Sequence, residues 1–84
     1  MLFPNPAGEF VNVKIQDETN VIKRIDIINT NGKIIRTLTN QVLNNNECKI
    51  SLAGIATGIY FIKISNNGWV ANKKLIVNSS LKSL

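Results

Sequence analysis

Short runs of alternating apolar and polar residues, separated by turn-forming residues about every ten positions, constrain the fold of this chain most strongly. In one of them Val11, Val13 and Ile15 occupy every second position, so they share one face of an extended strand. No stretch has the period of an amphipathic helix, and strands with this spacing are typical of two packed antiparallel sheets. We therefore predict an all-β fold, a small antiparallel β-sandwich of six or seven strands. The expected strands cover residues 11–15, 22–28, 33–38, 41–43, 48–52, 59–64 and 73–77.

The segment Thr30-Asn31-Gly32 lies between two of these runs and indicates a β-hairpin. A three-residue loop with its glycine in the left-handed conformation would place Ile27 opposite Ile35 and Asp26 opposite Arg36. A two-residue Asn-Gly turn would instead place Arg36 opposite Ile27. We favour the three-residue loop, because it leaves both isoleucines on one face and an opposite-charge pair on the other.

Residues 57–64 form the most informative single segment, since a turn glycine leads into a strand with two different faces. Gly58 is expected to serve a turn that has no room for a Cβ atom. Tyr60, Ile62 and Ile64 share one face, which we assign to the core, with the tyrosine hydroxyl bonded to a loop carbonyl. The opposite face carries Ile59, Phe61 and Lys63.

Ten lysines and arginines against five acidic residues give a net charge of +5, which raises nucleic acid as a partner. Phosphate binding needs clustered charge, and single-strand binding also needs aromatic side chains on which bases stack. Here the cations come one or two to each expected strand, and most aromatics fall in apolar patterns. We therefore predict no nucleic-acid partner and regard the lysines as residues that keep sheet edges soluble. The aromatic residues are Phe3, Phe10, Tyr60, Phe61 and Trp69.

The chain lacks the residues that most enzyme and metal sites require. It contains no histidine and one cysteine, which excludes a zinc site and a serine–histidine triad. Cys48 alternates with Ile50 and Leu52, so we expect it to face the core as a small hydrophobe. Asp17-Glu18 offers oxygens to calcium, but too few ligands converge there, and a solvated turn is the preferred interpretation. The sequence predicts no catalytic residue, no metal and no cofactor.

Trp69 leaves open a second class of function, a carbohydrate-binding module. Such modules stack sugar rings on rows of exposed aromatics, and Trp69 follows the Asn67-Gly68 turn, with Phe61 as a second candidate on its face. A single tryptophan after a turn more often packs into the core of a sandwich or covers its end. A passive fibronectin-like spacer is the third interpretation, and it gives the chain no binding role.

No apolar run approaches the roughly 18–20 residues that a transmembrane helix needs. The first residues also lack the basic end and the apolar stretch of a signal peptide. The chain is therefore expected to be intracellular or a piece of a longer protein, and Met1 set close before Pro4-Asn5-Pro6 favours the second.

Four short segments, in their order and separation, resemble one known family. It is the C-terminal sorting domain of proteins exported by the type IX (Por) secretion system of Bacteroidetes, and the resemblance runs from about Pro4 to Val77. It implies a sorting domain over residues 1–77 with an immunoglobulin-like fold. The polar residues 78–84 lack periodicity and are expected to form a disordered tail. The four segments are Pro4-Asn5-Pro6, Thr30-Asn31-Gly32-Lys33-Ile34-Ile35, Gly58-Ile59-Tyr60-Phe61-Ile62-Lys63-Ile64 and Lys73-Lys74-Leu75-Ile76-Val77.

The resemblance also implies a function. Such a domain ends a larger cargo protein and directs it from the periplasm across the outer membrane through the type IX translocon. A sortase-like signal peptidase commonly removes the domain, and the cargo is secreted or joined to an anionic lipopolysaccharide at the cell surface. The domain would be a signal and not an enzyme, in agreement with the absence of catalytic side chains.

Roles follow from the resemblance position by position. Pro4 and Pro6 either stiffen the junction with the cargo, next to a cleavage point just upstream, or start the first strand. Lys73 and Lys74 are candidate recognition residues for the secretion machinery, or else they keep an edge strand soluble. The remaining motif residues are expected to be structural: Asn5, Gly32, Gly58 and Tyr60.

Two departures from the family pattern are visible. Phe3 stands where the family usually has a tyrosine. Seven residues follow Val77, whereas family members tend to end within a few residues of the last strand. If those seven residues are native, an exposed C-terminal strand is not what the machinery reads.

Overall fold

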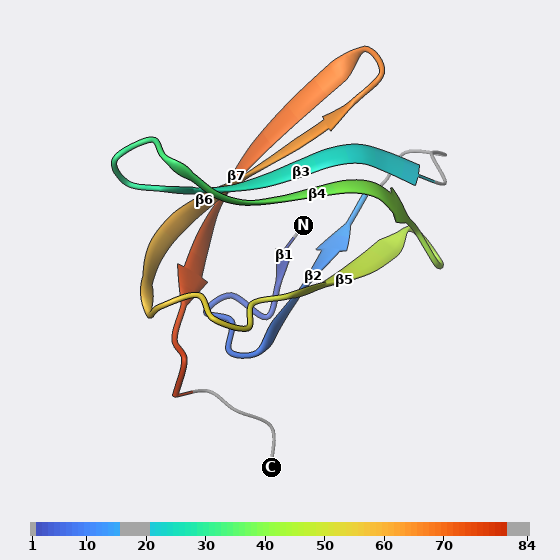
Figure 1. Ribbon diagram of the computed structural model, residues 1–84. Helices are drawn as coiled ribbons and strands as arrows, with labels where there is room; N and C mark the ends of the chain where they lie inside the picture. The colour runs from blue at the N-terminus through green and yellow to red at the C-terminus, as the bar shows by residue number, and fades with distance from the viewer. Residues whose placement is uncertain (1, 16–20, 81–84) are drawn as a thin grey trace.

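The computed structural model describes residues 2–15 and 21–80, and this part of the chain contains seven strands and no helix. The strands form two antiparallel sheets packed face to face (Figure 1), which confirms the predicted all-β sandwich. The calcium ligands considered at Asp17-Glu18 lie outside the described residues, as do residues 81–84 of the expected tail. The strands are β1 (Leu2–Phe3), β2 (Phe10–Lys14), β3 (Val21–Asn29), β4 (Ile34–Val42), β5 (Glu47–Ser51), β6 (Gly58–Asn66) and β7 (Trp69–Val77).

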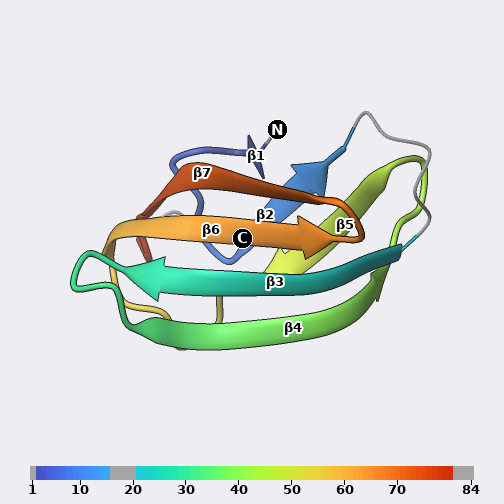
Figure 2. The same ribbon diagram turned by 90° about the horizontal axis from the view of Figure 1, so that it is seen from above.

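The three-stranded sheet has the order β1-β2-β5, and the four-stranded sheet has the order β4-β3-β6-β7. Figure 2 shows β4, β3, β6 and β7 side by side, with β2 and β5 running beneath them at an angle. The small-residue segment 52–57 carries the chain from β5 in one sheet to β6 in the other. The edge strands of the four-stranded sheet are therefore β4 and the last strand, β7.

Four strands, β3, β4, β6 and β7, are longer than the sequence predicted, and one strand was missed. Strand β4 continues to Val42 through Asn40, whose φ of 52° lies in the left-handed region that asparagine tolerates. Strand β7 begins at Trp69, directly after the turn. The missed strand, β1, has two residues, too few to show any alternation.

The core lies between the sheets and is built from the residues that alternate along each strand. On β6, Tyr60, Ile62 and Ile64 are buried, while Ile59 and Phe61 are exposed. Removing a large aliphatic side chain from water contributes about 1.5–3 kcal/mol, so this alternation decides which face of a strand turns inward. The largest fully buried side chains are Val11, Val13, Ile22, Ile25, Ile27, Ile50, Ile62, Leu75 and Val77.

Cys48 lies in this core, as its alternation with Ile50 predicts. Burial raises the pKa of the Cys48 thiol, because the thiolate is disfavoured away from water. A thiol kept neutral is a poor nucleophile, so Cys48 serves as a packing residue.

The β3–β4 hairpin has the three-residue loop that the sequence predicts. The Asn29 amide donates to the Lys33 carbonyl over 2.9 Å, which closes a loop of three residues. Gly32 has a φ of 82°, the left-handed conformation that glycine adopts without a steric penalty. The first pair beyond the loop is Ile28 opposite Ile34, as this loop requires.

Beyond that first pair the predicted register is wrong. A β-bulge shifts the pairing by one residue, so that Ile27 faces Arg36 and Asp26 faces Thr37. The expected pairs of Ile27 with Ile35 and of Asp26 with Arg36 do not form. The inserted residue leaves Ile35 39% exposed and turns Arg36 toward the inside of the sandwich.

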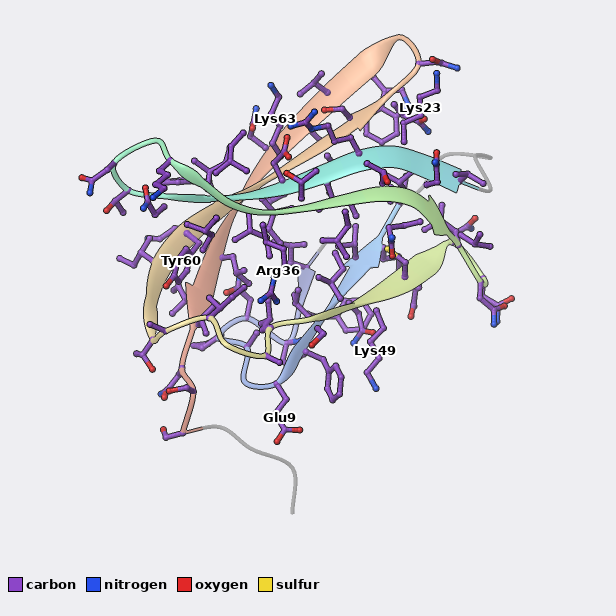
Figure 3. All side chains as sticks on the ribbon, in the orientation of Figure 1. Glu9, Lys23, Arg36, Lys49, Tyr60 and Lys63 are labelled. Atoms are coloured by element: carbon purple, nitrogen blue, oxygen red, sulfur yellow. The ribbon has the colours of Figure 1, made fainter. Side chains whose placement is uncertain are left out.

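The two charges that were expected to pair have separate partners. Figure 3 shows Arg36 pointing from β4 into the space between the sheets, where its guanidinium donates to the carbonyls of Ser51 (2.9 Å) and Ala53 (2.6 Å). Asp26 is 3% exposed and accepts hydrogen bonds from the Arg24 guanidinium, with Nε 3.0 Å from each oxygen, and from the Thr37 hydroxyl at 2.7 Å. Arg36 thus ties the edge of one sheet to the end of β5 in the other.

Gly58 does not have the role that the sequence predicted for it. Its φ is outside the left-handed region, and it is the first residue of β6, paired with Val77. A Cβ atom placed there would lie 3.6 Å or more from the Tyr60 side chain, an ordinary van der Waals distance. The left-handed glycine of this connection is Gly54, with a φ of 81°.

Candidate functional site

The Pro-Asn-Pro segment and the last strand meet at one edge of the molecule, although about seventy positions separate them. The Asn5 side-chain amide donates from Nδ2 to the Lys74 carbonyl, and its Oδ1 accepts from the Ile76 amide, both over 2.9 Å. An asparagine amide carries a donor and an acceptor side by side, so it pairs with a strand edge as a peptide group would. Asn5 therefore occupies part of the β7 edge that β6 leaves free.

The chain continues this pairing with its backbone. The Ala7 amide donates to the Ile76 carbonyl, and the Asn78 amide donates to the Ala7 carbonyl, both over 2.8 Å. Ala7 and Val77 form a parallel β-bridge, and Ala7 is fully buried. We call Asn5, Ala7, Lys73, Lys74 and Ile76 the junction site, because they join the start of the domain to its last strand.

Pro4 and Pro6 stand on either side of Asn5, and both follow cis peptide bonds. Neither proline has a backbone N–H group, so neither can donate to a strand. In this segment the pairing with β7 is made by the Asn5 side chain and then by the Ala7 backbone. Asn5, and not either proline, is therefore the residue whose side chain attaches the Pro-Asn-Pro segment to β7.

The two candidate recognition residues are both exposed, but they point to opposite faces of β7. Lys74 lies opposite Phe61 on the outer face of the four-stranded sheet. Lys73 lies opposite Ile62, on the side of the sheet that faces the core, and is exposed because β7 is an edge strand. The backbone of Lys74 belongs to the junction site through its bond to Asn5.

Tyr60 lies away from solvent, with 9% of its surface exposed, and its hydroxyl donates to the Ala56 carbonyl over 2.7 Å. Strand β6 places the ring inside the sandwich, and the carbonyl belongs to the segment that carries the chain from one sheet to the other. Tyr60 and Gly32 are not part of the junction site, because Tyr60 lies in the core and Gly32 lies in the β3–β4 loop.

Positive charge gathers on the four-stranded sheet, which the sequence did not predict. Of the nine lysines and arginines in the described residues, seven lie on its strands or in the β3–β4 loop. One acidic residue, Asp26, lies on these strands, and it is already bonded. Charges that are scattered along the chain are brought together by the strand order, and no pattern within one strand could have shown this. The seven are Lys23, Arg24, Lys33, Arg36, Lys63, Lys73 and Lys74.

Trp69 does not form an aromatic platform with Phe61. Trp69 is partly buried and packs against the core, whereas Phe61 lies on the outer face of the sheet. The shared face expected for a carbohydrate-binding surface is therefore wrong. Within residues 2–15 and 21–80 there is also no group of three or more metal-ligating side chains. The same residues include no helix that could span a membrane.

Comparison with protein families decides the identity of the chain. The model of a family described as the secretion system C-terminal sorting domain matches residues 1–78. The chain belongs to this family. No match was found among curated proteins.

The sorting domain is the C-terminal signal that directs a larger cargo protein through the type IX secretion system. Its destination is the cell surface or the extracellular space, reached by way of the periplasm. Neither the carbohydrate-binding nor the spacer interpretation is favoured. The family is not an enzyme family.

The hydrogen bonds of Asn5 are expected to stabilise the folded domain. Replacing Asn5 with alanine removes two hydrogen bonds to β7 and should lower the free energy of unfolding by about 1–2 kcal/mol. The measurement is urea denaturation of the purified chain. Asn72→Ala, on the exposed part of the same strand, is the control and should change stability by no more than about 0.5 kcal/mol. Equal effects of the two substitutions would show that the Asn5 bonds contribute nothing.

Proposed function

We propose that the secretion machinery recognises this sorting domain at the junction site, and that a sortase-like peptidase then cuts on the N-terminal side of Pro4. The domain contributes no catalytic group to either step. It serves as a folded signal domain that the translocon binds and the peptidase removes.

The observation that carries the proposal is the pair of hydrogen bonds from Asn5 to β7. They hold the end of the domain that adjoins the cargo against its last strand. A machine that binds β7 is thereby brought within reach of the segment where cargo and signal separate. Two motifs at opposite ends of the sequence become one binding surface.

The lysines give this surface its chemistry. Lys73 and Lys74 are exposed on opposite faces of β7, and neither forms an ion pair within the described residues. A strand edge with a cation on each side can accept a partner whose acidic groups lie on both sides of it. The competing role, a charged edge that prevents strand-to-strand aggregation, needs the same exposure but no partner.

The test uses the 84-residue chain as it stands, fused behind a signal peptide and a fluorescent protein in a type IX-competent bacterium. Fluorescence should reach the cell surface or the medium, and it should stay in the periplasm when the translocon is absent. Periplasmic retention in the competent strain would contradict the proposal.

Variants of the same fusion separate recognition from solubility. Lys73→Gln combined with Lys74→Gln should lower export by about tenfold, which corresponds to about 1.4 kcal/mol of lost binding. Lys33→Gln, in an exposed loop, is the control and should export normally. If the double variant is exported normally but aggregates when purified, the two lysines only protect the edge of the sheet from aggregation.

A further inference from the structure

The outer face of the four-stranded sheet carries an apolar surface that no part of the described chain covers. In the strand register Ile28 lies opposite both Ile34 and Phe61, and Ile59 lies opposite Ile76. Residues that are opposite one another in antiparallel strands have Cβ atoms about 5 Å apart, so these side chains are neighbours. We call Ile28, Ile34, Ile59, Phe61 and Ile76 the outer patch.

The exposure of the outer patch is large for residues of this kind. Ile34 and Ile59 are each 46% exposed and Phe61 is 42% exposed. The outward face of a sheet in a sandwich is ordinarily polar, because water covers it. Apolar side chains that adjoin across all four strands of a solvent-facing sheet indicate a surface that binds another molecule.

Cations flank the outer patch, and the acidic residue nearby, Asp26, is already paired with Arg24. Lys74 lies directly opposite Phe61, and Lys63 follows Phe61 two positions along β6. Figure 3 shows Lys63 pointing away from the three-stranded sheet, on the outer side. Asp26, opposite Lys63, is bonded instead to the Arg24 guanidinium and the Thr37 hydroxyl, so the charge that this face presents is positive.

We propose that the outer patch docks a protein of the secretion machinery whose contact surface has an apolar centre and acidic side chains at its rim. This inference rests on the function proposed above and names a second contact surface of the signal. The outer patch is distinct from the junction site, although Ile76 belongs to both and Lys74 of the junction site borders the outer patch. An apolar centre supplies affinity, and charges of opposite sign at the rim supply orientation and rate of encounter.

The same charges argue against the two other occupants. A second copy of the chain on this face would bring Lys63 and Lys74 toward their own equivalents, and like charges in contact oppose association. A lipid surface would favour apolar side chains on projecting loops or along an amphipathic helix, whereas the outer patch lies on the flat of a sheet. Both alternatives remain outcomes of the experiment.

The experiment again measures export of the fluorescent fusion, now with a matched pair of substitutions. Phe61→Asp should lower export by at least about tenfold, the effect of losing a central interface residue. Phe10→Asp is the control, because Phe10 is 37% exposed and stands beside Lys49 on the other sheet. It should export within about twofold of the unsubstituted fusion, a loss of less than about 0.5 kcal/mol.

The rim charges are tested separately from the apolar centre. Lys63→Glu should lower export by about fivefold or more, Lys63→Arg should leave it unchanged, and Lys49→Glu is the control on the opposite sheet. Thermal denaturation of each purified chain shows that an export defect is not a folding defect. Normal export of Lys63→Glu alongside failure of Phe61→Asp would overturn the acidic rim of the proposed partner.

The remaining outcomes distinguish this inference from the function on which it rests. If the unsubstituted fusion is not exported, the proposed function fails. If it is exported and Phe61→Asp is exported equally well, the outer patch is not a docking surface although the signal function stands. Sedimentation of the purified chain as a dimer that Phe61→Asp dissociates would assign the outer patch to a second copy. Binding to phosphatidylglycerol vesicles that Phe61→Asp abolishes would assign it to a membrane.

Discussion

Replacing Tyr60 with alanine should lower the free energy of unfolding by about 3–5 kcal/mol, the usual cost of deleting a large core side chain. Among the buried core residues of the described chain, Tyr60 is the one aromatic residue. Its hydroxyl also donates to the Ala56 carbonyl over 2.7 Å, which fixes the segment that joins the two sheets. A domain of this size has about 5–15 kcal/mol of stability in total, so the loss would leave much of the population unfolded on modest heating.

Two other substitutions separate the sources of this effect. Tyr60→Phe keeps the ring and loses the hydroxyl bond, so it should cost about 1 kcal/mol. Ile59→Ala, at the neighbouring exposed position, should cost less than Tyr60→Ala by at least about 2 kcal/mol. Urea and thermal denaturation of the purified chains measure all three. An unchanged Tm for Tyr60→Ala would contradict the assignment of Tyr60 to the core.

The sequence predicted the core residues of this sandwich well, because the alternation within a single strand is enough to show which of its side chains are buried. Alternation along β6 was enough to place Tyr60, Ile62 and Ile64 inside, and the same reasoning placed Cys48. Such a prediction needs no knowledge of which strands are neighbours. Each apolar side chain makes its own contribution to stability by leaving water.

What the sequence could not predict depends on pairing between strands. The bulge in the β3–β4 hairpin follows a loop of the expected length, and no residue type in the hairpin indicates that a bulge is present. The alternation of apolar residues specifies a face but not whether one extra residue is inserted, so it placed Ile35 on the face of Ile27 and Arg36 on the opposite face.

The junction site and the outer patch were beyond prediction for the same reason. Asn5 lies 69 and 71 positions from its two partners on β7, and its sequence neighbours gave no indication of them. The exposed face of β6 was foreseen, but its continuation into Ile28, Ile34 and Ile76 follows from the order β4-β3-β6-β7. Both surfaces are made by bringing together segments that were correctly identified one by one.

Arg36→Ala should lower the free energy of unfolding by about 2–3 kcal/mol, although a charged residue on an edge strand would ordinarily be replaceable. Its guanidinium makes charge-assisted bonds to the carbonyls of Ser51 and Ala53, each stronger than a bond between neutral groups. Truncation leaves those carbonyls without this donor and releases β4 from the end of β5. Arg36→Lys should recover part of the loss, because one ammonium group cannot reproduce the planar fork that serves two acceptors.

A double-mutant cycle with Asp26→Asn tests the register itself. In the observed pairing Asp26 is bonded to Arg24 and Thr37, and Arg36 points to the other side of the strand. The effects of Asp26→Asn and Arg36→Ala should therefore add to within about 0.5 kcal/mol. The register without a bulge would make the two residues cross-strand partners, and their coupling would then be favourable and would weaken as salt is added. A coupling near zero at low ionic strength, together with a large single effect of Arg36→Ala, is the result that only the bulged hairpin produces.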